Sequence, residues 1–239
     1  MSLHLLFAAA LLSFSLLRAE DVPVKLAEQI ESLRTANQAK ASPEKRAAYA
    51  AGIEAVKRAA VVEGAAKTGD TAPDFTLQNS RGQAVTLSEE LKKGPVVLTW
   101  YRGGWCPYCN VQLAAYQQIL PQIEELGAQL IAVSPELPDK SLTTVEKNGL
   151  HFTVLSDSGL KIAKKYSLVF ELTPEVEKLY AGFFNMEDYN GPDAAKNELP
   201  LAATYVIAPD GKITWSFLEA DYTKRAEPRD IIIALDAIE

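Results

Sequence analysis

The 239-residue chain has only two cysteines and two histidines, and this scarcity excludes several classes of protein. A disulfide-rich scaffold is excluded, because two cysteines can form only one bridge. A zinc site with four Cys or His ligands would need all four of these residues, and His4 lies close to the N-terminus. We therefore expect neither a metal site nor another cofactor.

Basic residues are also in deficit, with 24 Lys and Arg against 31 Asp and Glu, which gives a formal net charge of -7. A nucleic-acid partner is not expected, because no basic surplus exists to replace phosphate counterions. Beyond Ala19 no apolar run is long enough to cross a membrane. The 48% of hydrophobic residues is ordinary for a globular protein, so wholesale disorder is excluded.

The N-terminus has the pattern of a secretory signal peptide. Residues 1–17 carry no formal charge and contain an apolar run at 5–12, and Ala19 precedes an acidic pair. A short apolar core that ends in a small residue is typical of a signal peptide, here cleaved after Ala19. The alternative is an uncleaved N-terminal anchor. Both interpretations place the rest of the chain outside the cytoplasm, and we predict the periplasm.

Residues 20–66 form a predicted N-terminal helical extension, since residues 22–62 are rich in helix formers. Ser42 and Pro43 provide an N-cap and a first helical residue, so a second helix is expected to start there and to run to Gly64. We interpret this helical pair as a packing or dimerisation appendage and not as a catalytic part.

From residue 67 to 239 the pattern changes to short strands that alternate with helices. A hairpin is predicted over 75–86, strands over 95–101, 129–133, 152–155, 204–207 and 213–217, and helices over 88–91, 106–126, 142–148, 159–166 and 228–238. Residues 172–199 are less regular. This alternation predicts an α/β domain with a central mixed β-sheet that is flanked by helices.

The two cysteines occur in the segment Trp105-Cys106-Pro107-Tyr108-Cys109, directly after a buried strand and at the start of a helix. Backbone N–H groups and the positive end of the helix dipole favour a thiolate at this position. We therefore predict Cys106 as the nucleophile. Cys109 lies three residues further on the same helix face, within disulfide reach, and is predicted as the resolving thiol.

Redox chemistry is favoured over a structural disulfide, because a bridge that closes so short a loop removes little chain entropy. Arg102, four residues before Cys106, is a candidate for further stabilisation of the thiolate. We expect Trp105 to shape access to the thiol or to pack in the core, and Pro107 to occupy an early helix position where its missing N–H costs little.

Several segments resemble the thioredoxin-like superfamily and, within it, the AhpC/TSA peroxiredoxin-like family. They are the stretch Gly69–Leu77, the RGxWCPYC motif that ends at Cys109, the segment Glu146–Asp157, the segment Thr204–Gly211 and the stretch Asp221–Pro228. The resemblance implies a thioredoxin-like fold for residues 67–239. It also implies that Cys106 attacks a peroxide, that a Cys106–Cys109 disulfide forms, and that a thioredoxin-type protein reduces this disulfide.

The chain departs from the common pattern of this family, which has Thr or Ser three residues before the peroxidatic Cys and Pro seven residues before it. Counted from Cys106, these positions are Gly103 and Thr99. Arg102 or the distant Arg225 is then a candidate for the electrostatic role. The resemblance also implies a proline near the active site, and Pro200 is the nearest candidate.

The activity expected from the resemblance is an antioxidant one, the reduction of hydrogen peroxide or organic hydroperoxides. The alternative is a thiol–disulfide oxidoreductase that acts on exported proteins, because the motif Trp-Cys-Pro-Tyr-Cys is also typical of disulfide-exchange sites. The oligomeric state is open, and a homodimer is compatible with the sequence.

Overall fold

A computed structural model describes residues 25–192 and 196–238 of the chain. The predicted leader, residues 1–19, lies outside the described residues. Within the described part, none of the helices combines the length and the apolar character that a membrane span requires.

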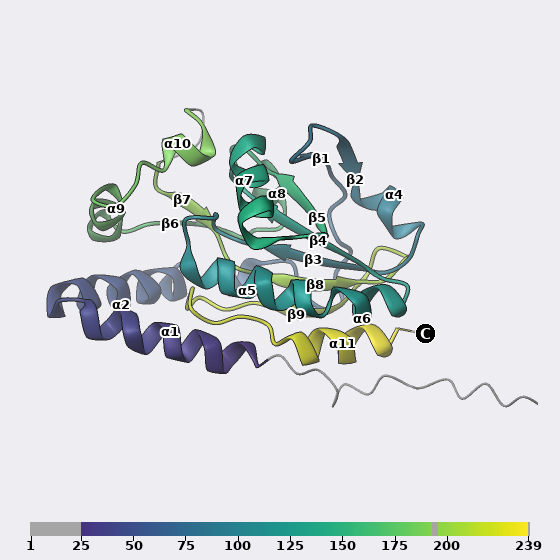
Figure 1. Cartoon of the computed structure of the whole chain (residues 1–239), viewed down its shortest axis with the longest axis horizontal. Coiled ribbons are helices and arrows are strands. Elements are labelled where there is room, and N and C mark those ends of the chain that lie inside the picture. The colour runs from purple at the N-terminus through teal and green to yellow at the C-terminus, as the bar shows by residue number, and fades with distance from the viewer. Residues whose placement is uncertain (1–24, 193–195, 239) are drawn as a thin grey trace, which may run out of the picture.

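The molecule is built around one seven-stranded mixed sheet with the order β2-β1-β5-β4-β3-β8-β9 (Figure 1). Its central strands β3, β4 and β5 are parallel, and the outer strands pair antiparallel. In chain order the strands of this sheet are β1 (Thr76–Asn79), β2 (Ala84–Thr86), β3 (Val96–Trp100), β4 (Gln129–Ser134), β5 (Thr153–Ser156), β8 (Thr204–Ile207) and β9 (Ile213–Phe217). This arrangement confirms the predicted α/β fold with a mixed sheet.

Helices cover both faces of the sheet, and a small second sheet of β6 (Val169–Glu171) and β7 (Glu198–Pro200) lies beside it. The helices are α1 (Leu26–Lys40), α2 (Pro43–Arg58), α3 (Val61–Gly64), α4 (Leu87–Leu91), α5 (Pro107–Gln118), α6 (Leu120–Glu125), α7 (Pro138–Asn148), α8 (Lys161–Lys165), α9 (Pro174–Ala181), α10 (Glu187–Asn190) and α11 (Pro228–Asp236).

Strand β3 is buried along its whole length, as its continuous apolar sequence predicts. Val97 faces the cluster that is formed with α1, α5, α6 and α11, whereas Leu98 and Trp100 face the cluster with α4 and α8. Because both faces of the sheet are covered, the end of β3 lies in the interior of the protein. The loop that carries the cysteine motif starts there.

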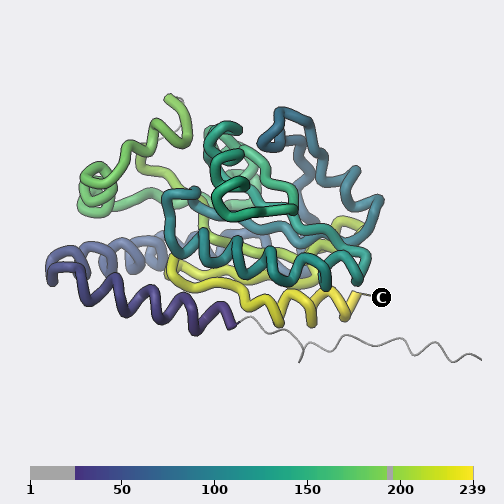
Figure 2. The backbone as a smooth tube through the Cα atoms, viewed as in Figure 1, coloured from purple at the N-terminus to yellow at the C-terminus, as the bar shows by residue number. Residues whose placement is uncertain are grey.

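The N-terminal helices pack on the domain, and they extend to the neighbourhood of the cysteines. The backbone N–H groups of Leu26 and Ala27 donate to the carboxylate of Glu227, which places α1 beside the start of α11 (Figure 2). Asn37 Nδ2, near the end of α1, donates to the hydroxyl of Tyr108 over 3.2 Å. Tyr108 lies between the two cysteines, so the extension contacts the functional motif directly.

Three sequence predictions about helices and the irregular region differ from the structure. Helix α2 ends at Arg58 and not at Gly64, because Ala60 adopts a left-handed conformation with φ of 52° and starts the separate turn α3. Helix α7 begins at Pro138, which suits a first helical position, instead of at residue 142. Residues 172–199 contain α9 and α10, whose short lengths gave little periodic signal.

Candidate active site

The cysteine motif lies where the chain leaves β3 and enters α5. Cys106 is the N-cap of α5 and Pro107 is the first helical residue, as predicted. The Cys106 N–H donates to the Gly103 carbonyl over 3.0 Å, which closes a tight turn before the helix. Both cysteines are reduced, and both are buried, with 1% of Cys106 and none of Cys109 exposed.

The sulfur of Cys109 accepts hydrogen bonds from three directions. The backbone N–H of Arg102 lies 3.5 Å from it, and Nη2 of Arg225 lies 3.4 Å from it. The Cys106 thiol also donates to this sulfur. The guanidinium contact is therefore made to the second cysteine of the motif and not to the first.

These contacts separate the acidities of the two thiols. Burial raises the pKa of both, and for Cys106 the hydrogen bond that it donates to Cys109 raises it further. For Cys109 the hydrogen bond from Cys106 and the charges of Arg225 and Arg102 outweigh burial, so its pKa lies well below the usual value. The sequence predicts Cys106 as the thiolate from its position at the helix start, but the electrostatics of the folded protein favour Cys109.

Counted from Cys109, the family pattern departs at two different residues. Three residues before Cys109 is Cys106, so a thiol stands where the family pattern has a hydroxyl. Seven residues before Cys109 is Arg102, which stands where the pattern has proline. Cys106 donates to the Cys109 sulfur from this position. The pattern thus does not decide between the two cysteines, and the hydrogen bonds to the Cys109 sulfur are what favour Cys109.

Arg225 is held in place by α5 and by its own loop. Its Nε donates to Gln112 Oε1 over 2.6 Å, and its Nη1 donates to the carbonyls of Tyr222 and Lys224. Gln112 lies three residues after Cys109 on the same helix face and in turn donates to Thr99 Oγ1 over 3.0 Å. Both Arg225 and Gln112 are buried, so a buried hydrogen-bond network holds the cation against the thiol.

Arg102 is the second buried cation of the site, and aromatic side chains surround it. One Nη2 N–H donates to the hydroxyl of Tyr180. The central carbon of the guanidinium lies 4.7 Å from the ring centre of Tyr222, 5.2 Å from that of Trp105 and 5.5 Å from that of Tyr180. Trp105 itself stacks on Phe184. The predicted support residues Arg102 and Trp105 thus lie in contact, beside the thiols.

The buried carboxylate of Glu136 organises the loop before Cys106. Glu136 follows β4, and its oxygens accept hydrogen bonds from the Gly104 N–H over 2.9 Å, from the Tyr101 hydroxyl over 3.1 Å and from Thr144 Oγ1 over 3.3 Å. Burial raises the pKa of Glu136, which these hydrogen bonds partly oppose. No sequence pattern points to Glu136, since only the fold brings it to the loop.

Replacing Glu136 tests whether this acceptor holds the loop. Glu136→Leu leaves the part-buried Gly104 N–H and the buried Tyr101 hydroxyl without this acceptor and is expected to lower the free energy of unfolding by about 2–4 kcal/mol. Glu136→Gln keeps an acceptor and is expected to cost less than about 1 kcal/mol at neutral pH. Because the pKa of Glu136 is raised in the folded state, the wild-type protein loses stability as pH rises through that pKa. The Glu136→Gln variant has no such pH dependence at this position. Urea unfolding of both variants at pH 5 and 7 measures this.

Gly104 has no room for a side chain. A Cβ at this position would lie 2.1 Å from Thr144 Oγ1. Gly104→Ala therefore has to displace Thr144 from Glu136, and we expect it to cost about 1–3 kcal/mol. Gly64→Ala is a matched control, because a Cβ there meets nothing within 4 Å. Equal melting temperatures for the two variants would contradict the expected crowding.

Pro200 does not belong to the group of residues around Arg102. It ends β7 and pairs with Val169 of β6 in the small sheet, and the peptide bonds of the described residues, including the one before Pro200, are trans. Its observed role is in that pairing. Among residues 25–192 and 196–238, no three Cys, His, Asp or Glu side chains gather closely enough to hold a metal ion.

The site thus combines a buried dithiol in a CxxC motif at a helix start with a guanidinium that contacts the second sulfur. It lies in an α/β fold with a mixed sheet, and these features define the class of protein. Solved structures share this fold. Peroxidoxin BcpB from Mycobacterium tuberculosis has a TM-score of 0.57 and 22% identity, covering 72% of this chain and 98% of its own. Peroxiredoxin Q from Xanthomonas campestris has a TM-score of 0.53 and 20% identity, covering 68% and 90%. These likenesses confirm the thioredoxin-like fold.

The AhpC/TSA family pattern matches residues 68–216, and the chain belongs to the AhpC/TSA family. Among curated proteins, the chloroplastic peroxiredoxin Q of Sedum lineare is 32% identical over 104 residues, which are 44% of this chain and 55% of that protein. The chloroplastic peroxiredoxin Q of Oryza sativa subsp. japonica is 33% identical over 112 residues, 47% of this chain and 51% of that protein. The chain spans about half the length of these relatives.

Proposed function

We propose that the protein is a thiol-dependent peroxidase that reduces hydrogen peroxide or organic hydroperoxides through Cys109 and Cys106. The observation that carries this proposal is the buried Cys109 sulfur, which accepts hydrogen bonds from the Arg225 guanidinium and the Arg102 backbone. A thiolate that is held by positive charge is the nucleophile that peroxide reduction needs. Membership of the AhpC/TSA family supports the same activity.

The first step oxidises Cys109. Its thiolate attacks the terminal peroxide oxygen, an S–O bond forms and the O–O bond breaks, so the sulfur loses two electrons and becomes a sulfenic acid. The leaving oxygen takes a proton from solvent and departs as water or alcohol. The Arg225 and Arg102 guanidinium groups lie where negative charge moves from sulfur to the leaving oxygen, and they stabilise it there.

The second step uses Cys106, whose thiol already contacts the Cys109 sulfur. Its sulfur attacks the sulfenic sulfur, an S–S bond forms, and the hydroxyl group leaves as water with the proton of the Cys106 thiol. An external dithiol protein of the thioredoxin type then reduces the disulfide and becomes a disulfide itself. The roles of the two cysteines are thus the reverse of those that the sequence predicts.

Burial of the thiols favours peroxide over protein disulfides as the oxidant. Since at most 1% of either cysteine is exposed, a small peroxide has better access to the sulfur than a protein disulfide does. A solved relative supports this assignment, because one Xanthomonas campestris structure is described for its alkyl peroxide reduction activity. Disulfide exchange on exported proteins is the competing outcome in the test.

The test compares peroxide and protein disulfides as substrates. We expect the reduced protein, supplied with thioredoxin, thioredoxin reductase and NADPH, to consume hydrogen peroxide or cumene hydroperoxide with one NADPH per peroxide. Insulin reduction in the same system should not exceed the rate of thioredoxin alone. Slow, uncatalysed peroxide loss together with faster insulin reduction would instead establish the disulfide-exchange activity.

We also propose that the protein is exported, on the basis of the apolar run at 5–12 and the small residue Ala19. We expect the mature protein in a periplasmic extract to begin at Glu20, which N-terminal sequencing would show. A homodimer is part of the same proposal. Light scattering of the purified protein decides between monomer and dimer.

A further inference from the structure

Arg225 lies between β9 and α11, and we call residues 222–227 of this connection the Arg225 loop. Its guanidinium donates to uncharged acceptors, which are the side-chain oxygen of Gln112 and two backbone carbonyls of its own loop. In the part of the chain that the structure describes, no carboxylate forms an ion pair with Arg225. The positive charge is therefore left to act on the Cys109 sulfur, which lies 3.4 Å from Nη2.

Helix α1 holds the end of the Arg225 loop that leads into α11. The backbone N–H groups of Leu26 and Ala27 donate to the two carboxylate oxygens of Glu227 over 3.2 and 2.5 Å. Both groups lie in the first turn of α1, where backbone N–H groups have no partner inside the helix, so a carboxylate is a favourable acceptor. Leu26 is also fully buried, in the same apolar cluster as Ala226. Helix α1 thus fixes the chain directly after Arg225.

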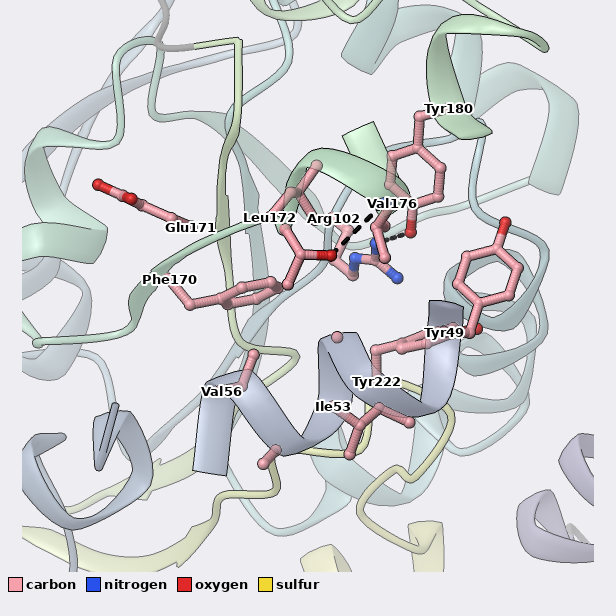
Figure 3. A pocket seen from close by; sticks show the side chains of 13 residues that line it. Tyr49, Ile53, Val56, Arg102, Phe170, Glu171, Leu172, Val176, Tyr180 and Tyr222 are labelled. Atoms are coloured by element: carbon pink, nitrogen blue, oxygen red, sulfur yellow. Dashed lines mark hydrogen bonds between the residues drawn. The ribbon is translucent and has the colours of Figure 1, made fainter. Parts of the chain in front are cut away.

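Helix α2 packs on the other end of the loop. The ring of Tyr49 lies 6.0 Å from the ring of Tyr222, centre to centre (Figure 3). The Tyr222 ring in turn lies 5.8 Å from that of Tyr108, between the two cysteines, and 4.7 Å from the central carbon of the Arg102 guanidinium. The carbonyl of Tyr222 accepts one of the Arg225 hydrogen bonds. A shift of Tyr222 would therefore move an acceptor of Arg225.

The N-terminal extension and the Arg225 loop both lie outside residues 68–216, which match the AhpC/TSA pattern. The sequence predicts the extension as a packing or dimerisation appendage. In the structure it contacts both ends of the loop, and Asn37 of α1 also donates to the hydroxyl of Tyr108. The contacts that place a cation at the sulfur thus come from segments of this chain that the family pattern does not include.

We propose that the N-terminal extension is a brace that holds the Arg225 guanidinium at the Cys109 sulfur. Helix α1 acts through Glu227 and helix α2 through Tyr49. These two are positioning residues, because they act on the thiol through Arg225. The attraction between a cation and a thiolate weakens as their distance and the access of water increase, so a looser loop makes the thiol less acidic. The inference rests on the proposed role of Cys109 as the reactive thiol.

The first test removes the acceptor that α1 binds, with Glu227→Ala in the otherwise intact chain. The reference and the variant both carry Cys106→Ser, so Cys109 is the only thiol, and the serine hydroxyl can still donate to its sulfur. The ultraviolet absorbance of the thiolate, followed against pH, gives the acid dissociation constant without a reagent that has to enter the site. We expect Glu227→Ala to lower this constant about three- to tenfold, within the range for residues coupled through a contact network.

The direction of the change distinguishes the brace from a direct effect of charge. Glu227 is an acid, so removing its negative charge would by itself stabilise a thiolate and raise the dissociation constant of Cys109. A fall is expected only if the loss of the α1 contact loosens Arg225. Arg102 and Glu136 also act on the charge of Cys109, and both are the same in the two proteins. An unchanged or raised constant in folded Glu227→Ala protein would overturn the proposal.

A second substitution shows whether the effect passes through Arg225. In an Arg225→Gln background, Glu227→Ala is expected to cause no further fall, because the cation that the brace holds is absent. Equal falls in the two backgrounds would mean that Glu227 acts by another route and would contradict the inference. The matched control is Glu31→Ala, which removes an exposed carboxylate of α1 that pairs with Arg34 of the same helix. It should leave the constant unchanged.

Tyr49→Leu tests the contact from α2, and it also serves if circular dichroism shows that Glu227→Ala does not fold. It removes the ring that packs on Tyr222, and we expect the dissociation constant of Cys109 to fall about two- to fivefold. Phe183→Leu is the control, because Phe183 is 68% exposed and contacts α2 through Lys45, away from the loop. Equal constants for the two variants would refute the brace.

The ionisation of Cys109 is measured without peroxide, so the outcome does not depend on turnover. Peroxide reduction by the wild-type protein, together with a constant that Glu227→Ala and Tyr49→Leu leave in place, refutes this inference alone. A lowered constant in both variants of a protein that does not reduce peroxide refutes the proposed function alone.

Discussion

Cys109→Ser is expected to abolish peroxide reduction, with a loss of about a thousandfold or more in the rate of the first step. Serine keeps the size of the side chain but provides no nucleophile at neutral pH, since its hydroxyl does not ionise under the influence of Arg225. Stopped-flow tryptophan fluorescence measures the step, because Trp105 lies in contact with the site. No fluorescence change is expected on mixing the reduced variant with hydrogen peroxide.

Cys106→Ser is the matched control, and it separates the two roles. If Cys109 attacks the peroxide, the variant retains a rapid single turnover and accumulates one sulfenic acid, which dimedone traps on Cys109. Turnover with thioredoxin is lost, because no intramolecular disulfide can form. The opposite pattern, with a silent Cys106→Ser and a reactive Cys109→Ser, would restore the order of roles that the sequence predicts.

Arg225→Gln is expected to slow the first step about a hundredfold, comparable to the removal of one preorganised donor in other active sites. The guanidinium stabilises the Cys109 thiolate, so its removal raises the pKa of that thiol and lowers the thiolate fraction at neutral pH. The pH profile of alkylation by iodoacetamide should therefore shift to higher pH. A profile that stays in place would show that Arg225 does not govern the thiol.

Two further variants show whether the effect depends on charge or on structure. Arg225→Lys keeps the charge but loses the fork that bonds both Gln112 and the sulfur, so we expect an intermediate rate and an intermediate pH profile. Arg58→Gln removes an exposed charge at the end of α2 and should change neither quantity. Thermal unfolding of each variant shows whether the loop held by Arg225 is intact.

Local patterns predict most of the scaffold because they act over a few residues. The apolar run of β3 requires a strand that is buried on both faces, and Ser42 with Pro43 starts α2 as expected, with Ser42 accepting from the Lys45 N–H. The end of α2 is less predictable from the sequence, because the left-handed Ala60 interrupts a run of good helix formers. Tertiary packing overrides propensity at such positions.

The irregular region before β8 illustrates a second limit. Tyr180 and Phe184 lie there, and the sequence allows them either a groove or core packing. In the structure they pack with Trp105, and Tyr180 also contacts Arg102. Their position depends on how α9 folds over the motif, since Tyr180 lies 78 positions from Arg102 in the chain, and no periodic pattern encodes that placement.

The pair of thiols in one helical turn, directly after a buried strand, can be predicted from the sequence alone, because a CxxC spacing and an apolar run are local properties. Which thiol is the more acidic depends on contacts that form only in the folded protein. Arg225 is separated from Cys109 by 116 positions, yet its guanidinium lies 3.4 Å from the sulfur. Coulomb interactions depend on distance through space and on burial, so the difference in acidity between the two thiols comes from cations that chain order does not place beside them.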